Sequence, residues 1–266
     1  MTTHAHDEQI ARIAASERLL IALDFDGTLA PLIDEPMQAR AIPAAREALD
    51  RLSALPDTAI ALVSGRQLAD LVIISEHPDD SPIHLAGSHG AEMWHPAAFA
   101  VPPRNMAHEV TQRAESESIV AAAQGIVTDI PGAWIEPKAF GFGLHTRLSD
   151  AEGSDRAAAQ IERLVAERAP HWRRRTGRDI LEFAWRHEGK DSAVASLREL
   201  TGATAVLFAG DDVTDEHAQR TLRPGDVGIR IGPGPTSAPF TVATPEAFSE
   251  VLEELVSLRT SRARTR

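Results

Sequence analysis

The stretch of sequence that decides the fold is Leu19-Leu20-Ile21-Ala22-Leu23-Asp24-Phe25-Asp26-Gly27-Thr28-Leu29. Its apolar half is typical of a buried parallel strand that ends at a turn signal. Asp24 and Asp26 follow where this strand leaves the sheet, which is the edge where open α/β folds bind ligands. Buried carboxylates there need a partner, and a divalent cation would provide one. We interpret Asp24 as a nucleophile and Asp26 as its acid/base neighbour. The alternative is that both residues only end the strand and start an Asp-Gly turn.

The composition is that of an ordinary globular protein. The chain has 266 residues, enough for one large domain or for a core domain with a smaller one beside it. Its net charge of −12 argues against a protein that binds nucleic acid or an anionic membrane. The absence of cysteine excludes disulfides, thiolate metal sites and cysteine nucleophiles. With no signal-peptide pattern and no apolar run of about 20 residues, we expect a cytoplasmic protein. The sequence does not determine the oligomeric state, for which a monomer is the favoured expectation.

Strand and helix patterns alternate on both sides of a different middle section, which predicts a doubly wound parallel sheet. A strand at 58–63 runs into Ser64-Gly65-Arg66, where Ser64 could offer its hydroxyl to an anion or could simply cap the next helix. A strand beginning at Leu85 ends in Gly87-Ser88-His89-Gly90, where a lone histidine between glycines is more often a turn residue than a ligand contact. The other predicted elements are helices at 7–16, 43–55, 67–74, 189–200 and 245–258, and strands at 205–209 and 227–231.

The middle section reads as an inserted α+β cap domain. Pro102-Pro103 is typical of a linker. Residues 104–184 would form the cap, and residues 1–103 and 185–266 the core. Arg173-Arg174-Arg175 fits a solvated strand face better than a nucleic-acid patch. The cap is expected to contain helices at 107–124 and 154–168 and strands at 133–138, 141–147, 172–175 and 179–183, the last two joined around Thr176-Gly177-Arg178. We expect a loose start at 1–5 and a disordered end at 259–266.

Several chemical groups should meet at one edge of the parallel sheet. We expect Lys190 and Asp211 to lie within about 10 Å of Asp24. A magnesium ion would relieve the repulsion among the carboxylates, while Lys190 and Ser64 would contact a phosphoryl group. In this reading Asp24 forms an aspartyl-phosphate, Asp26 transfers protons, and Lys190 neutralises charge. The expected metal ligands and orienting groups are Asp24, the backbone carbonyl of Asp26, Asp211, Asp212 and Asp215.

Four segments resemble, in order, the four motifs of the haloacid dehalogenase superfamily. They are 24–29, 64–66, Lys190 and 210–216. The chain further resembles the trehalose-6-phosphate phosphatases, through 87–92, Glu136-Pro137-Lys138 with His145 and Arg147, 177–182 and 210–216. That resemblance spans about residues 19–250. It implies that Glu136, Lys138 and Glu182 bind sugar hydroxyls on the cap, with Arg66, His89, Gly90, His145 and Arg147 as further substrate contacts. For each cap residue, the alternative is an exposed strand charge.

Departures from the family pattern remove no catalytic group but leave the choice of sugar phosphate open. Phe25 stands where tyrosine is common, Asp191 follows Lys190 in place of glycine, and His217-Ala218-Gln219 follows Glu216. The chain could therefore act on glucosylglycerate, glucosylglycerol or sucrose phosphate, or transfer a phosphoryl group as phosphomannomutases do. A non-catalytic sugar-phosphate sensor is a further alternative, although Asp24, Asp26, Lys190 and Asp211 are all retained.

Overall fold

The computed structural model describes residues 2–99, 107–177 and 179–265, which form two compact units. One unit contains Met1–Val101 and Glu188–Arg266, and the other contains Pro102–His187. We call them the core unit and the cap unit. The predicted linker at Pro102-Pro103 and the turn residue Arg178 lie outside the described residues.

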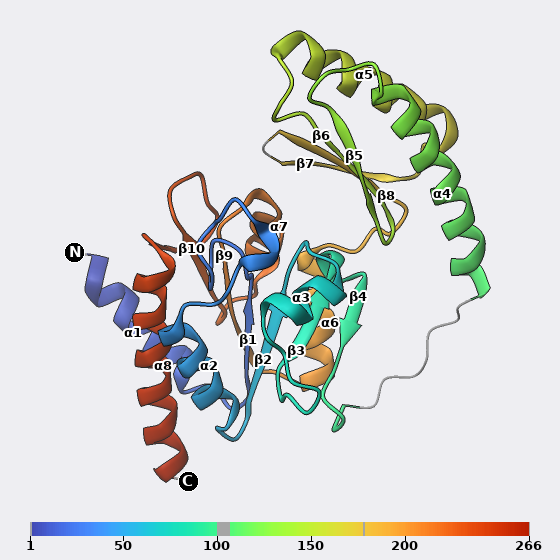
Figure 1. Cartoon of the computed structure of the whole chain (residues 1–266). Coiled ribbons are helices and arrows are strands. Elements are labelled where there is room, and N and C mark those ends of the chain that lie inside the picture. The colour runs from blue at the N-terminus through green and yellow to red at the C-terminus, as the bar shows by residue number, and fades with distance from the viewer. Residues whose placement is uncertain (1, 100–106, 178, 266) are drawn as a thin grey trace. The chain divides into compact units, whose positions relative to one another are not determined.

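The core unit is built on a seven-stranded sheet, with β1 in its centre (Figure 1). The strand order is β11-β10-β9-β1-β2-β3-β4, and every neighbouring pair is parallel except β3–β4. This topology confirms the predicted doubly wound α/β fold. The strands are β1 (Leu19–Leu23), β2 (Thr58–Val63), β3 (His84–Gly87), β4 (Glu92–Trp94), β9 (Ala205–Gly210), β10 (Val227–Ile231) and β11 (Phe240–Val242).

Helices cover both faces of this sheet because successive side chains of a strand point to opposite faces. Leu19, Ile21 and Leu23 of β1 enter one apolar core, whereas Leu20 and Ala22 enter the other. The first core is closed by α1, α2, α3 and α8, and the second by α6 and α7. The helices are α1 (Thr2–Ala14), α2 (Pro43–Ser53), α3 (Leu68–Ile74), α6 (Lys190–Thr201), α7 (Val213–Thr221) and α8 (Pro245–Thr265), with 3-10 turns η1 (Pro36–Gln38) and η2 (Ser88–Gly90).

The cap unit has a four-stranded antiparallel sheet in the order β5-β6-β8-β7, with α4 and α5 on one of its faces (Figure 1). Ile135, Phe142, Leu144 and Phe183 are buried on that face. The elements are α4 (Ala107–Val127), β5 (Trp134–Lys138), β6 (Gly141–His145), α5 (Ala151–Arg168), β7 (Arg173–Gly177) and β8 (Ile180–Ala184). Arg174 forms an ion pair with Glu162 of α5, and the Arg173 guanidinium bonds the His187 carbonyl.

The structure corrects the predictions at both ends of the chain. Residues 2–5 were predicted to be loose but belong to α1, and residues 259–265 were predicted to be disordered but belong to α8. Arg259 holds α8 in place through hydrogen bonds to Thr58 Oγ1 and to four main-chain carbonyls, those of Ala14, Ser16, Pro56 and Asp57. Among the described residues, no helix has the length and apolar character needed to cross a membrane.

Candidate active site

The site begins where β1 ends. The Asp24 amide donates to the Ala209 carbonyl of β9, so the first carboxylate is fixed against the neighbouring strand. Phe25 is buried in the apolar core, which is why an aromatic residue fits between two aspartates. Gly27 has φ +75°, and a Cβ there would lie 2.1 Å from Asp211 Oδ2. Glycine is therefore required both for the turn and for the close approach of Asp211.

Lys190 links the N-terminal part of the core unit, which contains Asp24, to the C-terminal part, which contains Asp215. As the first residue of α6, it is only 2% exposed. Its Nζ lies 2.8 Å from Asp24 Oδ1 and 2.7 Å from Asp215 Oδ1. Burial alone would lower the pKa of Lys190, but Asp215 and Asp24 raise it above its usual value. The ammonium is therefore held in its charged form between two buried carboxylates.

The end of β9 presents three aspartates around the start of α7. Asp212 caps this helix by accepting from the Asp215 amide at 2.9 Å. Asp215 Oδ2 in turn accepts from the amides of Asp211 and Asp212, each at 3.0 Å. These bonds leave Asp215 fixed toward Lys190, while Asp211 faces the turn at Gly27.

Asp24, Asp211 and Asp215 make an acidic cluster, each with an oxygen within 4.8 Å of an oxygen of the other two. Burial raises the pKa of Asp24 to about 8, because loss of water outweighs the attraction of Lys190. Burial, with Asp215 and Asp212 nearby, raises the pKa of Asp211 to about 6. One lysine cannot neutralise this much negative charge. The cluster is suited to a hard divalent cation, for which carboxylate oxygens are the preferred ligands.

Asp26 has a different partner. Arg66 donates from both Nε and its terminal nitrogen to the two Asp26 oxygens, each at 2.6 Å. The hydrogen bond to Asp26 raises the pKa of Arg66. Ser64, just after β2, is buried, and its hydroxyl accepts from the Arg66 amide at 3.1 Å. The role of Arg66 as a substrate contact stays a prediction, and the structure adds that its guanidinium pairs with Asp26.

His89 and Gly90 lie in η2, next to the Ser64 loop. The His89 amide donates to the Ser64 carbonyl, and a Cβ on Gly65 would lie 2.8 Å from the His89 ring. Ser88, His89 and Gly90 have φ values of +48°, +58° and +102°, so three successive residues adopt the left-handed conformation. For Ser88 and His89 this is strained, and strain of this kind is concentrated at functional sites. The structure thus places His89 in a turn that lies against Ser64-Gly65, and its role as a substrate contact stays a prediction.

The cap residues form a second group on the sheet face that α4 and α5 leave uncovered. Glu136, Lys138, His145 and Glu182 share this face, because they pair in register across β5, β6 and β8. Lys138 bonds Glu182, and His145 Nε2 lies 2.7 Å from Glu136 Oε2. This hydrogen bond to His145 lowers the pKa of Glu136.

Trp134, which was not among the predicted site residues, lies on the same face of the cap sheet. Its ring stacks on His145, with centroids 4.6 Å apart and an interplanar angle of 2°, and the Arg147 guanidinium lies 5.6 Å from its centroid. His145 and Arg147 thus contact a neighbouring side chain as well as being predicted substrate residues. A Trp two residues before Glu136 on an edge strand was the available signal.

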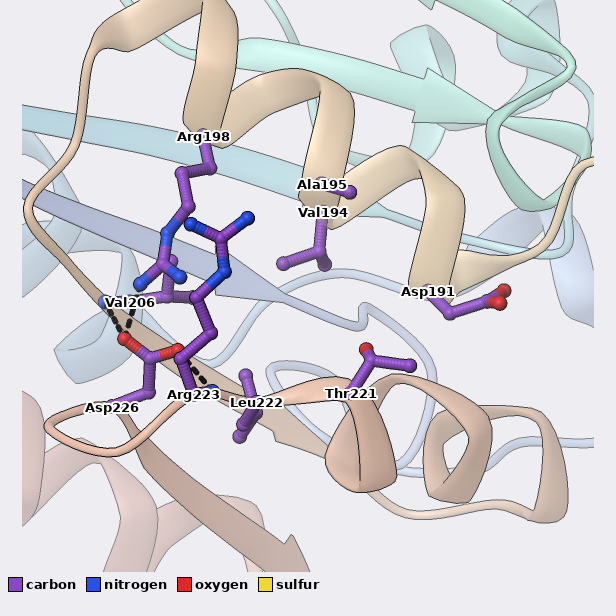
Figure 2. Close-up of a pocket in the computed structure, with 9 residues that line it drawn as sticks. All are labelled: Asp191, Val194, Ala195, Arg198, Val206, Thr221, Leu222, Arg223 and Asp226. Atoms are coloured by element: carbon purple, nitrogen blue, oxygen red, sulfur yellow. Dashed lines mark hydrogen bonds and ion pairs between the residues drawn. The ribbon is translucent and has the colours of Figure 1, made fainter.

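A cavity of about 50 Å³ lies elsewhere in the core unit, between α6, β9 and the end of α7 (Figure 2). Ligand pockets typically measure roughly 300–1,000 Å³. Arg198 and Asp226 face each other in this cavity, and Asp226 also accepts from the amides of Val206 and Arg223 (Figure 2). None of the predicted site residues lines it. We assign it a structural role in joining α6 to β9 and β10.

The fold and the site together define a protein of the haloacid dehalogenase class. Its marks are a central parallel strand that brings Asp24 to a buried lysine and an acidic cluster, and an α+β unit inserted after β4. Within this class, the chain belongs to the trehalose-phosphatase family, whose model matches residues 22–246.

Known proteins are similar to the chain over most of its length. It is 32% identical over 254 residues to the trehalose-phosphate phosphatase of Mycobacterium avium (strain 104), a match that covers 88% of this chain and 61% of the relative. The chain thus spans about three fifths of the length of that curated relative. The C-terminal domain of C. albicans trehalose-6-phosphate phosphatase has TM-score 0.75 and 22% identity, covering 96% of each chain. The Aspergillus fumigatus trehalose-6-phosphate phosphatase has TM-score 0.70 and 23% identity, covering 96% of this chain and 97% of that one. At these identities the structures support the fold.

Proposed function

We propose that this protein hydrolyses trehalose 6-phosphate to trehalose and phosphate. The observation that carries the proposal is the buried contact of Lys190 with Asp24 and Asp215, in a chain of the trehalose-phosphatase family. The contact supports phosphoryl transfer, where positioning and charge neutralisation supply most of the catalysis. The substrate is inferred from the names of the relatives.

The chemistry would proceed in two displacements. An Asp24 oxygen attacks phosphorus, the bond from phosphorus to the sugar oxygen breaks, and Asp26 gives that oxygen a proton. Water then attacks the aspartyl-phosphate, its proton passes to Asp26, and the bond from phosphorus to Asp24 breaks. Lys190 would balance the charge on the phosphoryl oxygens, and the Ser64 hydroxyl would donate to one of them.

We propose Mg²⁺ as the cofactor. Asp24, Asp211 and the backbone carbonyl of Asp26 would hold it, while Asp212 and Asp215 would orient this shell through their bonds at the start of α7. Bound there, the ion would neutralise charge on the phosphoryl group. Its fit is supported by the raised carboxyl pKa values of the acidic cluster.

On the cap unit, we propose that Glu136, Lys138 and Glu182 hydrogen-bond the sugar. Carboxylates accept from hydroxyl groups and an ammonium donates to them, so the three can recognise a polyol. A site of this kind discriminates against sugars that lack the matching hydroxyl. Arg66, His89, Gly90, His145 and Arg147 stay predicted contacts, and the cytoplasmic location and monomeric state stay predictions of the sequence.

The test is phosphate release from a panel of substrates, with Mg²⁺ and with EDTA. The panel contains trehalose 6-phosphate, sucrose phosphate, the phosphates of glucosylglycerol and glucosylglycerate, and glucose 6-phosphate. We expect the highest kcat/KM with trehalose 6-phosphate and a loss of turnover in EDTA that Mg²⁺ restores. Preference for another sugar phosphate would keep the reaction and overturn the substrate. Binding of trehalose 6-phosphate without turnover of any member would indicate a sensor.

A further inference from the structure

Gly143 lies in the middle of the polar face of the cap sheet. It belongs to β6, between β5 and β8, and pairs in register with Glu136 on one side and Glu182 on the other. Because side chains alternate along a strand, the missing side chain of Gly143 would point to the same face as these two carboxylates. A position without a side chain thus separates the two acidic groups of the predicted sugar site.

The backbone does not explain this glycine. At Gly141, two residues earlier, a Cβ would lie 1.9 Å from the Phe183 carbonyl oxygen, so the main chain there requires glycine. Gly143 has no left-handed φ, and the three atoms nearest to a Cβ there all belong to side chains. A glycine inside a strand weakens it and often marks a place where a ligand approaches the backbone closely.

Two of the three side chains nearest to the missing Cβ belong to the predicted sugar site, and the third is Ile180. A Cβ on Gly143 would lie 3.5 Å from Lys138 Cε, 3.7 Å from Glu136 Oε2 and 3.2 Å from Ile180 Cδ1. Lys138 starts on β5 and reaches across β6 to bond Glu182 on β8. The space beside Gly143 is therefore the centre on which the carboxylates and the ammonium converge.

We propose that Gly143 is a specificity-determining residue: without a side chain there, Lys138 can cross β6 and hold its ammonium between Glu136 and Glu182, where the hydroxyl groups of a hexose can reach all three groups. The inference rests on the proposed function, because it takes the ligand to be the sugar of a sugar phosphate. The charges favour such a ligand, since hydroxyl groups can donate to both carboxylates and accept from Lys138 at once. A methyl group at position 143 would press on the Ile180 side chain and lie against the Lys138 stem, and so would disturb this arrangement.

The experiment compares Gly143→Ala and Gly143→Val with Gly125→Ala. Gly125 lies in α4 of the same unit, and a Cβ there would contact nothing within 4 Å, so Gly125→Ala is the matched control. Kinetics are measured with the sugar phosphate that the wild type hydrolyses best and with p-nitrophenyl phosphate, which has no sugar. Thermal melting of each variant reports on folding.

We expect Gly143→Ala to raise KM for the sugar phosphate by about tenfold and Gly143→Val to raise it further. The reason is that a side chain at position 143 would displace groups that contact the sugar and so weaken its binding. Turnover of p-nitrophenyl phosphate should stay within about twofold of the wild type, and Gly125→Ala should match the wild type in both assays.

An unchanged KM for the sugar phosphate in a folded Gly143→Ala variant would overturn the inference. Equal losses on both substrates would also overturn it, since they would indicate damage to folding or to the core unit. Failure of the proposed function is distinct: the wild type itself would then prefer another phosphate, and the Gly143 variants would be compared on that substrate.

Discussion

Asp24 and Lys190 are buried in direct contact, so each determines the state of the other. Asp24→Asn keeps the shape of the side chain and can still accept a hydrogen bond from Lys190, but an amide does not attack phosphorus. We expect phosphate release to fall by at least about 10³-fold, in line with the loss of other catalytic nucleophiles. A melting temperature close to that of the wild type would show that the fold is intact. Near-normal turnover by this variant would remove Asp24 from the nucleophile role.

The ion pair of Arg66 with Asp26 predicts a selective defect. Arg66→Gln should leave the Asp26 carboxylate free to rotate and so misplace the proton donor. Because positioned proton transfer contributes about 10²–10⁴-fold, we expect a loss of at least tenfold on the sugar phosphate. The loss on p-nitrophenyl phosphate should be smaller, since its leaving group needs no proton.

Arg66→Lys is the control for that prediction. It keeps the charge but replaces the two-pronged guanidinium contact by a point charge, so its turnover should fall between the wild type and Arg66→Gln. Equal losses on both substrates in Arg66→Gln would show that Arg66 acts on the phosphoryl group and not through Asp26.

For single residues, the sequence predicted which groups converge at the site but not which side chains form pairs there. Asp24, Lys190 and Asp211 were expected at one sheet edge because parallel strands bring their ends together. The contact of Arg66 with Asp26 depends on side-chain rotamers after two neighbouring strands, for which strand pattern carries no information. Trp134 was missed for the same reason, since what marks it is the stacking of its ring on His145 of the neighbouring strand.

Among the elements, α8 departs most from expectation. Four arginines among small polar residues suggested disorder, yet Arg259 is buried and bonds four carbonyls. Arg259→Met should leave those carbonyls without their donor and lower the free energy of unfolding by about 2–3 kcal/mol. Urea unfolding of the metal-loaded protein would measure this, with the exposed Arg264→Ala as a control expected to change stability by less than about 0.5 kcal/mol. Equal stability of both variants would show that the hydrogen bonds of Arg259 do not hold α8 in place.

The long periodic segments were predicted well, and the three-residue strands were not. The predicted strand at 58–63 coincides with β2, and α2 starts at the predicted Pro43. β4 and β11 were missed, because three residues are too few to show a period and each relies on pairing with β3 or β10. Thr176 and Gly177 belong to β7, although the sequence indicated a turn there.

For the whole molecule, the acidic cluster couples stability to pH and to metal. Asp24 and Asp211 have pKa values raised to about 8 and about 6, so their protonated forms favour the folded state. This contribution is fully present below the ordinary carboxyl pKa and is lost as the pH rises through 6 and 8. In EDTA, we expect the melting temperature to fall between pH 5 and pH 8.5.

Mg²⁺ should reverse that trend, because it binds the ionised carboxylates and stabilises the folded state by mass action. The rise in melting temperature on adding Mg²⁺ should be larger at pH 8.5 than at pH 5, and Asp211→Asn should diminish it. A rise of the same size at both pH values, or one that Asp211→Asn leaves unchanged, would contradict this account.

The position of β9 beside β1 also matters for synthesis on the ribosome. β1 ends at Leu23 and β9 begins at Ala205, so 182 residue steps separate the two neighbours. At about 5–20 residues per second, β1 waits roughly 10–40 s for its second partner strand. For most of that interval the nascent polypeptide carries Asp24 without Lys190, and for all of it without Asp211. The proposed phosphoryl chemistry would need both residues, and β1 is exposed meanwhile to other pairing partners.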